Sequence, residues 1–394
     1  MPPRPDETGL AAPLPGAPDP WAASSMPELL PGPPYLTARM IAAEPGVVAR
    51  VAARVGSNPS GPALAAAIAD ALKRGEPVTT TGCGTSEHAA LAAAALIADA
   101  AGPGRAHLVR CWQALDLAQA PQRTGLVIGI SHEGGTSATN QAITAARSAG
   151  AGTAIVTVSA RSPGGAAAEI AVETGEQDQS WCHTVGYVSP IVALAAVASL
   201  LRGERLDSAA VRALLGAALA EEGAAEATAR ALTGCHRLLV SGAGVDLVSA
   251  RELALKIEEG AALPATALHL ETVRHGHLAA ADASTGIVLI LTEAERGGEA
   301  VVARAGGVLR SAHELGMPAA AIGAPRIHAA LPAELLTAGR LTVPEVADVA
   351  PQVISLLGAT IPLQLLALHL AMARGRNPDA IGRDDPRQAA AAEA

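Results

Sequence analysis

Two residues in the second half of the chain, Glu259 and His275, have the chemistry of an acid/base pair. They lie in residues 251–278, RELALKIEEGAALPATALHLETVRHGHL, where apolar residues first recur at helical spacing and a glycine turn follows. The pattern predicts that Glu259 lies at the end of a buried helix and that His275 lies in the turn. A carboxylate and an imidazole in these positions could transfer a proton to and from a bound molecule.

Simpler interpretations of these residues stay open. A glutamate at a helix end is usually a solvated charge, and Lys256 lies four residues after Glu252, a spacing typical of an ordinary helical ion pair. A metal site is a weaker interpretation because the spacing of the histidines differs from HExxH, so we predict neither a metal nor a cofactor. Three polar neighbours are second choices as site residues, after Glu259, His275 and Lys256. They are His269, Glu271 and His277.

The elements that must position these residues alternate between strand and helix in both halves of the chain. A long apolar helix is expected to close each half, at 183–203 and at 353–375. Alternation of this kind predicts parallel sheets with helices on both faces. The predicted strands cover residues 77–82, 124–131, 152–160, 236–244, 286–292 and 317–323.

The two halves repeat the same spacing. Gly84 lies 47 positions before Ser131, Gly244 lies 48 positions before Thr292, and the two glycines are 160 positions apart. This pattern indicates an internal duplication of one βαβ unit. The expected organisation is an irregular Pro-rich tail, a first domain, a second domain and a C-terminal tail, at residues 1–34, 35–203, 204–375 and 376–394.

An early helical stretch, YLTARMIAAEPGVVARVAARV, is expected to break at Pro45. The net charge is −9 without a run of lysine and arginine, which argues against nucleic acid as a partner. The four cysteines have no metal-site spacing and are expected to be reduced thiols. The N-terminus lacks the apolar core of a signal peptide, and no apolar run is expected to reach the roughly 20 residues that span a bilayer. We therefore expect a cytoplasmic protein with no membrane partner.

Two loops, GCGTS at 82–86 and SHEGGTS at 131–137, each follow a predicted strand and open a helix. Ligands of parallel sheets bind at such strand ends, where free helix N–H groups attract anions. The loops suit a phosphate monoester, although serine and threonine are also common helix caps. The candidate binding residues are Gly84, Thr85, Ser86, Ser131 and Thr136.

Four motifs, in order and spacing, resemble the sugar isomerase (SIS) domain family. CGTSEHAA resembles CGTSYHAA, SHEGGTSAT resembles SQSGETADT, SGAGVDLVSARELALKIEE resembles GRGxxYPIALEGALKLKE, and RHG resembles the start of a KHGP turn. The resemblance covers about residues 35–385 and is to the isomerase half of glucosamine-6-phosphate synthases and to related sugar-phosphate isomerase/deaminases. It implies two tandem three-layer α/β/α SIS domains with parallel, Rossmann-like sheets.

The resemblance also implies roles for individual residues. Glu259 would move a proton between C1 and C2 of a sugar phosphate, and Lys256 would lie near the substrate. His275 would help to open the sugar ring from the neighbouring subunit, which implies a homodimer with a shared active site. The first-domain loops would hold the phosphate, and His183 and Thr184, expected at the start of the closing helix, align with a Ser-Thr pair near it.

The chain departs from the family pattern at several positions. Glu133 replaces a phosphate-binding serine, and a carboxylate repels a phosphate dianion at close range. His132 replaces a glutamine and could compensate by donating a hydrogen bond, whereas His277 replaces the proline of KHGP. The C-terminal Schiff-base lysine has no counterpart, although Arg383 and Arg387 could enter the site.

These observations predict an aldose–ketose isomerase or deaminase that acts on a sugar phosphate, with an amino or glycated sugar expected. No glutaminase activity is expected, since the N-terminus lacks the cysteine that begins a glutaminase domain. The alternative is a non-catalytic, sugar-phosphate-binding regulator, which Glu133 and the missing tail lysine favour slightly.

Overall fold

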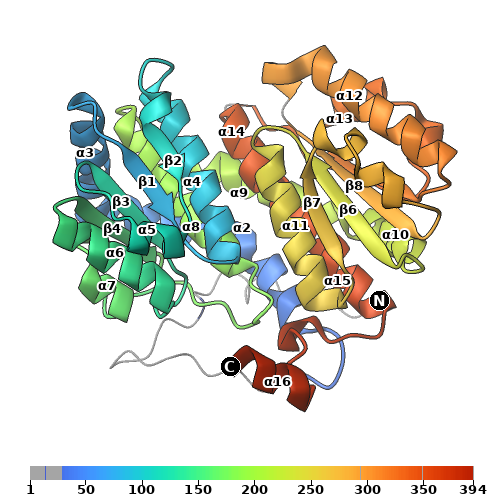
Figure 1. The fold of residues 1–394 in the computed structure, drawn as a ribbon, viewed down its shortest axis with the longest axis horizontal. Helices are drawn as coiled ribbons and strands as arrows, with labels where there is room; N and C mark the ends of the chain where they lie inside the picture. Colours follow the sequence, from blue (N-terminus) through green and yellow to red (C-terminus); the bar gives the residue numbers. More distant parts are fainter. Residues whose placement is uncertain (1–13, 15–28, 293, 348, 394) are drawn as a thin grey trace. The chain divides into compact units, whose positions relative to one another are not determined.

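The computed structural model contains two compact units, each built on a parallel sheet (Figure 1). The first unit consists mainly of residues 43–178 and 185–212, and the second combines residues 213–393 with two short segments, 29–42 and 179–184. The predicted Pro-rich tail falls largely outside the described residues. The structure describes residues 14, 29–292, 294–347 and 349–393.

The first unit has a five-stranded sheet with the strand order β2-β1-β3-β4-β5. Every pair of neighbouring strands in it is parallel. Its strands are β1 (Val78–Thr81), β2 (Val109–Cys111), β3 (Leu126–Ile130), β4 (Gly152–Thr157) and β5 (Ile170–Glu173). Its helices are α3 (Ser60–Lys73), α4 (Thr85–Ala101), α5 (Ala114–Gln119), α6 (Ser137–Ala149), α7 (Pro163–Ala167) and α8 (Val185–Leu201).

The second unit repeats this topology, since its order β10-β9-β8-β6-β7 is the same series read from the other edge. These strands are also parallel. They are β6 (Arg237–Gly242), β7 (Ala265–His269), β8 (Thr285–Leu291), β9 (Ala319–Gly323) and β10 (Gly339–Thr342). The helices are α10 (Glu222–Leu232), α11 (Asp246–Ala261), α12 (Ala294–Glu314), α13 (Pro325–Ala330), α14 (Pro351–Val353), α15 (Thr360–Ala373) and α16 (Pro386–Glu393). Two further helices, α2 (Leu36–Ser57) and α9 (Ser208–Ala218), each contribute residues to both units.

Helices cover both faces of each sheet. From its central pair of strands, each sheet extends in two directions, and right-handed crossovers then put the connecting helices on opposite faces. In the first unit α4 packs on α8, while α5 packs on α6. In the second unit α11 and α10 pack on α15, while α12 packs on β8 and β9. The predicted α/β architecture with parallel sheets is therefore confirmed.

The sequence pattern predicted three strands in each half, and the structure has five. The four additional strands, β2, β5, β7 and β10, are the edge strands of the two sheets. Central strands such as β3 and β8 are buried along their whole length, whereas the edge strands are partly exposed. A short, half-exposed strand carries little apolar signal, which is why all four were missed.

The turn that leaves the first strand has the same geometry in both units. Gly84 and Gly244 have φ angles of 57° and 56°, a left-handed conformation that favours glycine. A Cβ atom added to Gly82 or Gly242 would lie 2.4 or 2.5 Å from backbone atoms of the following helix. Each G-x-G turn therefore brings its helix closer to the strand than any side chain at the first glycine permits.

Two predicted helix boundaries were wrong. Helix α2 continues through Pro45, because Val47, Val48 and Val51 are fully buried and their packing holds the helix together. Helix α8 begins at Val185, so His183 and Thr184 precede it. The Asp178 carboxylate accepts the N–H of Gly186 at 2.9 Å and thereby caps this helix from seven residues upstream of Val185.

The expectation that no apolar run could span a bilayer was also wrong. Residues Pro351–Ala373 form a continuous 23-residue helical stretch with a mean hydropathy of 1.8 in its most apolar window. Since 89% of that window is buried inside the protein, the stretch is a core helix of the second unit.

We predict that alanine at Gly82 or at Gly242 destabilises the protein by about 2–3 kcal/mol, since the added methyl overlaps backbone that cannot rotate away. Alanine at Gly216, inside helix α9 with open space around it, is the control and should be neutral or stabilising by about 0.5–1 kcal/mol. Urea unfolding would measure both effects. Equal stability of the Gly82 and Gly216 variants would contradict the prediction.

Candidate functional site

Helix α11 carries three charged residues on one buried face. Glu252, Lys256 and Glu259 follow one another at helical spacing, and the first two are 0% and 1% exposed, against 21% for the side chain of Glu259. The Lys256 ammonium donates to Oε2 of Glu259 at 2.5 Å and lies 3.6 Å from Oε1 of Glu252. One buried cation is thus shared by two carboxylates.

The environment alters the protonation of this cluster. Burial opposes the charge on Lys256, but the carboxylates of Glu259 and Glu252 outweigh it and raise the pKa of the ammonium, so it stays charged. Burial raises the pKa of Glu259, and the adjacent Lys256 opposes part of that rise. A carboxyl group whose pKa lies above its ordinary value is suited to accept and return a proton near neutral pH.

The segment 179–184 brings three more polar residues to α11. The Cys182 thiol is buried and hydrogen-bonds to the Glu259 carboxylate. Burial and the neighbouring positive charge of Lys256 lower the pKa of His183 to about 4, while Glu252 opposes this and Arg383 adds to it. The His183 imidazole is therefore neutral at pH 7. Thr184 is also buried.

Two residues near the C-terminus, Asp379 and Arg383, bind segments that surround α11. The Asp379 carboxylate accepts the N–H groups of Leu36 and Thr37 at 2.8 and 2.7 Å, and the Thr37 hydroxyl at 2.7 Å, so it caps the start of α2. The Arg383 guanidinium stacks on the ring of Trp181 at 3.4 Å from its centre. Arg383, the predicted tail contact, therefore lies against the segment that carries His183.

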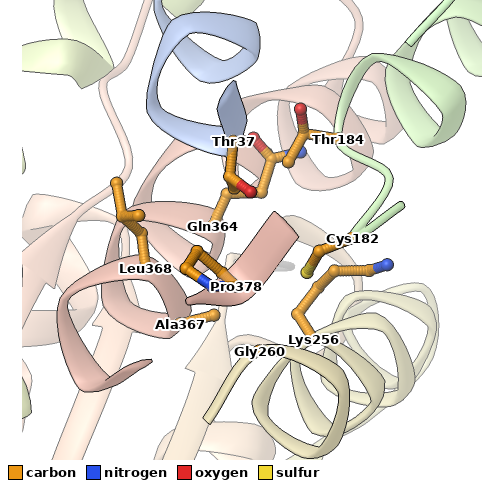
Figure 2. Close-up of a pocket in the computed structure, with 9 residues that line it drawn as sticks. All are labelled: Thr37, Cys182, Thr184, Lys256, Gly260, Gln364, Ala367, Leu368 and Pro378. Atoms are coloured by element: carbon orange, nitrogen blue, oxygen red, sulfur yellow. The ribbon is translucent and has the colours of Figure 1, made fainter. Parts of the chain in front are cut away.

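A small pocket lies among these elements (Figure 2). Its free space is about that of a single water molecule. It receives side chains from α2, the segment 179–184, α11, α15 and the turn before α16. The lining residues are Thr37, Cys182, Thr184, Lys256, Gly260, Gln364, Ala367, Leu368 and Pro378.

Backbone strain is found just after α11 and within the C-terminal turn. Among the described residues, only Ala262 and Ile381 combine a side chain with a left-handed backbone, with φ angles of 48° and 45°. Ala262 follows the end of α11, and Ile381 lies between Asp379 and Arg383. Strain of about 1–3 kcal/mol at each such residue persists only where its surroundings enforce it, and it is common at binding sites.

The two predicted anion loops lie in the first unit. Gly84 precedes α4, Thr85 is buried at its start, and Ser86 is partly exposed beside it. In the second loop Ser131 is buried and its hydroxyl donates to Oγ1 of Thr136 at 3.3 Å. The loops therefore follow β1 and β3, the two central strands at which the connections diverge, as ligand-binding loops do in this topology.

The two unusual residues of the second loop differ in their environment. His132 is buried, and its Nε2 accepts the backbone N–H of Asp178 at 2.9 Å, which orients the ring toward its own unit. Glu133 is partly exposed. Nε2 of His132 is thus occupied as an acceptor, which leaves Nδ1 as the donor nitrogen of the neutral ring.

The corresponding loops of the second unit are closed by a carboxylate. Asp246, at the start of α11, occupies the position that Ser86 has in the first unit. Its two oxygens accept the N–H of Thr292, at 2.7 Å, and the Thr292 hydroxyl. A carboxylate of the chain itself thus already lies at the start of this helix.

His275 lies at the surface of this chain. Its side chain is 69% exposed, and Nε2 lies 3.1 Å from Oε1 of Glu271, which also binds Arg304 at 2.6 Å. Within the part of the chain that the structure describes, no contact links His275 to Glu259. The structure thus brings Lys256, His183 and Arg383 together around α11, but not His275.

Four residues of this region were not recognised as site residues in the sequence: Cys182, Gln364, Asp379 and Thr37. One signal was available, because Gln364 is a lone amide in an apolar helix, TIPLQLLALHLAMA. The others gave none, since a cysteine, a threonine and an aspartate acquire their partners only when distant segments meet.

Comparison with solved structures identifies the fold of this chain. No family model and no curated protein matches the sequence. Among solved structures, the C-terminal domain of glucosamine-fructose-6-phosphate aminotransferase from Francisella tularensis matches with a TM-score of 0.72 and 19% identity, covering 88% of this chain and 98% of that one. This chain has the phosphosugar isomerase fold. The parallel α/β fold that the four motifs indicated is thereby confirmed.

Two further structures with the phosphosugar isomerase fold support the match. Tagatose-6-phosphate ketose/aldose isomerase from Escherichia coli has a TM-score of 0.68 and 18% identity, over 88% of this chain and 95% of its own. Glucosamine-6-phosphate deaminase from Thermotoga maritima has a TM-score of 0.64 and 15% identity, over 88% and 97%. At these identities the comparison concerns the fold alone.

We predict that His183 makes the protein sensitive to acid. In the unfolded chain this histidine takes up a proton near pH 6.5, whereas in the folded chain it does so only near pH 4. The contribution of neutral His183 to the free energy of unfolding is therefore present above pH 6.5 and is lost as the pH falls toward 4. The loss amounts to about 3 kcal/mol. Replacing His183 by Asn should remove this part of the fall in unfolding free energy.

The measurement is urea unfolding at several pH values between 4 and 7. An Asn variant of the exposed His107 is the control and should keep the wild-type profile. Identical pH profiles for wild type and the His183 variant would show that the imidazole is not held neutral by this cluster.

Proposed function

We propose that this chain is a tandem pair of SIS domains that interconverts an aldose phosphate and a ketose phosphate, with Glu259 as the base. One observation carries the proposal: in a phosphosugar isomerase fold, the carboxyl group at the motif position is partly buried, has a raised pKa and is held at 2.5 Å by a lysine. General base catalysis supplies about 10²–10⁴-fold in rate.

The proposed step conserves all atoms. The Glu259 carboxylate accepts the proton from the carbon next to the carbonyl, which leaves an enediolate, and the carboxylic acid then returns the proton to the former carbonyl carbon. The hydroxyl proton moves from the oxygen of the first carbon to the former carbonyl oxygen, so that the new carbonyl forms. The Lys256 ammonium, which is paired with Glu252 and Glu259, holds the Glu259 carboxylate at 2.5 Å and so positions the base. The neutral His183 beside Lys256 adds no further positive charge to this region.

An amino or glycated sugar phosphate is the substrate that we favour. If the reacting carbon carries an amine, proton transfer produces an imine, and water then hydrolyses it to the ketose and releases the amine. Free ammonia or an amine is then a product, and no glutaminase reaction is part of the proposal. The names of two of the similar structures, an aminotransferase domain and a deaminase, support this preference.

The phosphate is assigned to the first-unit loops that carry Ser86, Ser131 and Thr136. The equivalent position in the second unit is Asp246, whose carboxylate already binds Thr292, and this supports the choice. His275 is assigned to the active site of a neighbouring copy of the chain, and its 69% exposure leaves it available for that contact. The active form is accordingly a homodimer in the cytoplasm.

A second candidate function is a sugar-phosphate sensor without catalysis. Glu133 favours it, because this residue departs from the phosphate-binding serine of the catalytic family that the sequence resembles. The two candidates differ in one measurable property, the exchange of the C2 proton of the bound sugar with solvent.

The test is a Gln substitution of Glu259. We expect Glu259→Gln to lower turnover and C2 proton–deuterium exchange at least about 100-fold, while sugar-phosphate binding changes little, since the amide keeps the shape but accepts no proton. Glu258→Gln is the matched control, because Glu258 is exposed on the same helix and its carboxylate accepts the backbone N–H of Ala265.

NMR in D₂O with glucosamine 6-phosphate, fructose 6-phosphate and tagatose 6-phosphate would measure exchange, and thermal shift would measure binding. Undiminished exchange in the Glu259 variant would refute its role as base. Binding without exchange in the wild type would favour the sensor, and no binding by any sugar phosphate would refute both candidates.

A further inference from the structure

Gln364 places a buried amide in an apolar helix. Its side chain is 2% exposed, and neither its oxygen nor its nitrogen has a hydrogen-bond partner among the residues that the structure describes. An unpaired buried amide is costly, so such groups normally bind protein, water or a ligand. Gln364 lines the pocket beside α11, and Figure 2 shows its side chain near Thr37 and Thr184.

Another buried glutamine shows what a structural role looks like. Gln122 is 7% exposed, its oxygen accepts the Thr79 hydroxyl at 2.6 Å, and its nitrogen donates to the carbonyls of Thr124 and Pro77 at 2.7 and 3.2 Å. Gln122 therefore ties loops of the first unit together. Gln364 has none of these connections, although its helix is among the most apolar in the chain.

The surroundings of Gln364 specify the kind of group that it would bind. The Thr37 hydroxyl is already engaged by Asp379, at 2.7 Å, and the Lys256 ammonium is paired with two carboxylates. An anion would thus meet no free positive charge in this pocket. The amide offers both donors and an acceptor, and the space is about that of one water molecule, which a hydroxyl group matches in size and in hydrogen bonding.

We propose that Gln364 binds one hydroxyl group of the sugar substrate and so contributes to substrate specificity. This inference rests on the proposed function, because it takes the ligand to be a sugar phosphate. The pocket is the right place for such a contact, since Lys256, Gly260 and Cys182 also line it and flank Glu259 on α11 and on the segment 179–184. The hydroxyl contacted by Gln364 therefore lies near the reacting carbons.

The experiment compares Gln364→Leu and Gln364→Met with Gln122→Leu in two measurements. In the ligand-free protein, both Gln364 variants should melt at the wild-type temperature or above it, because they remove an unpaired polar group, whereas Gln122→Leu should melt lower. In the second measurement, titration calorimetry compares glucose 6-phosphate and fructose 6-phosphate with analogues that each lack one hydroxyl.

Wild type should bind one parent sugar phosphate about tenfold more tightly than the analogue lacking the hydroxyl that Gln364 contacts. The Gln364 variants should lose that preference by weakening only the parent, and Gln122→Leu should keep it. If the variants keep every deoxy preference, or if they melt as low as Gln122→Leu, the assignment of Gln364 is overturned while the proposed function stands. If wild type binds no sugar phosphate, the proposed function fails, and this inference fails with it.

Discussion

The buried ammonium of Lys256 is the charge on which the polar region of the second unit depends. Glu252 is fully buried, and an unpaired carboxylate in that position would cost several kcal/mol, about 3–5 by analogy with broken buried ion pairs. The same ammonium binds Glu259 at 2.5 Å and lowers the pKa of His183. One cation therefore compensates a structural carboxylate and holds the candidate base, and it adds to the burial that keeps the His183 imidazole neutral. A single helix face, with residues at successive turns, is enough to place the cation and its two carboxylates.

Segments far apart in the sequence complete the region around that face. Residues 179–184 supply Cys182 and His183, the start of α2 supplies Thr37, and the C-terminal turn supplies Pro378. Asp379 ties the last two together, since its carboxylate caps the start of α2 across more than 340 positions of sequence. The strained residues Ala262 and Ile381 lie just after α11 and within the C-terminal turn.

The two units have one topology but different chemistry at equivalent turns. Both G-x-G turns have the same left-handed glycine and the same close approach of strand and helix. Two positions after the left-handed glycine, the first unit has Ser86 and the second has Asp246. A serine leaves the helix N–H groups available to an anion, whereas the aspartate carboxylate brings its own negative charge and binds Thr292. The same fold can thus present a binding loop in one copy and a closed, structural turn in the other.

Local patterns in the sequence were enough to identify the central strands, the helix that carries Glu252, Lys256 and Glu259, and the paired glycine turns, because these depend on residues close together in the chain. The four edge strands, the continuation of α2 through Pro45 and the start of α8 at Val185 could not be read in this way. They depend on pairing with a neighbouring strand, on buried valines and on a cap from Asp178. The same holds for Gln364 and Cys182, whose surroundings are created when separate segments pack together. Periodicity encodes burial along one element, but the partners of a buried polar group are chosen by contacts between elements.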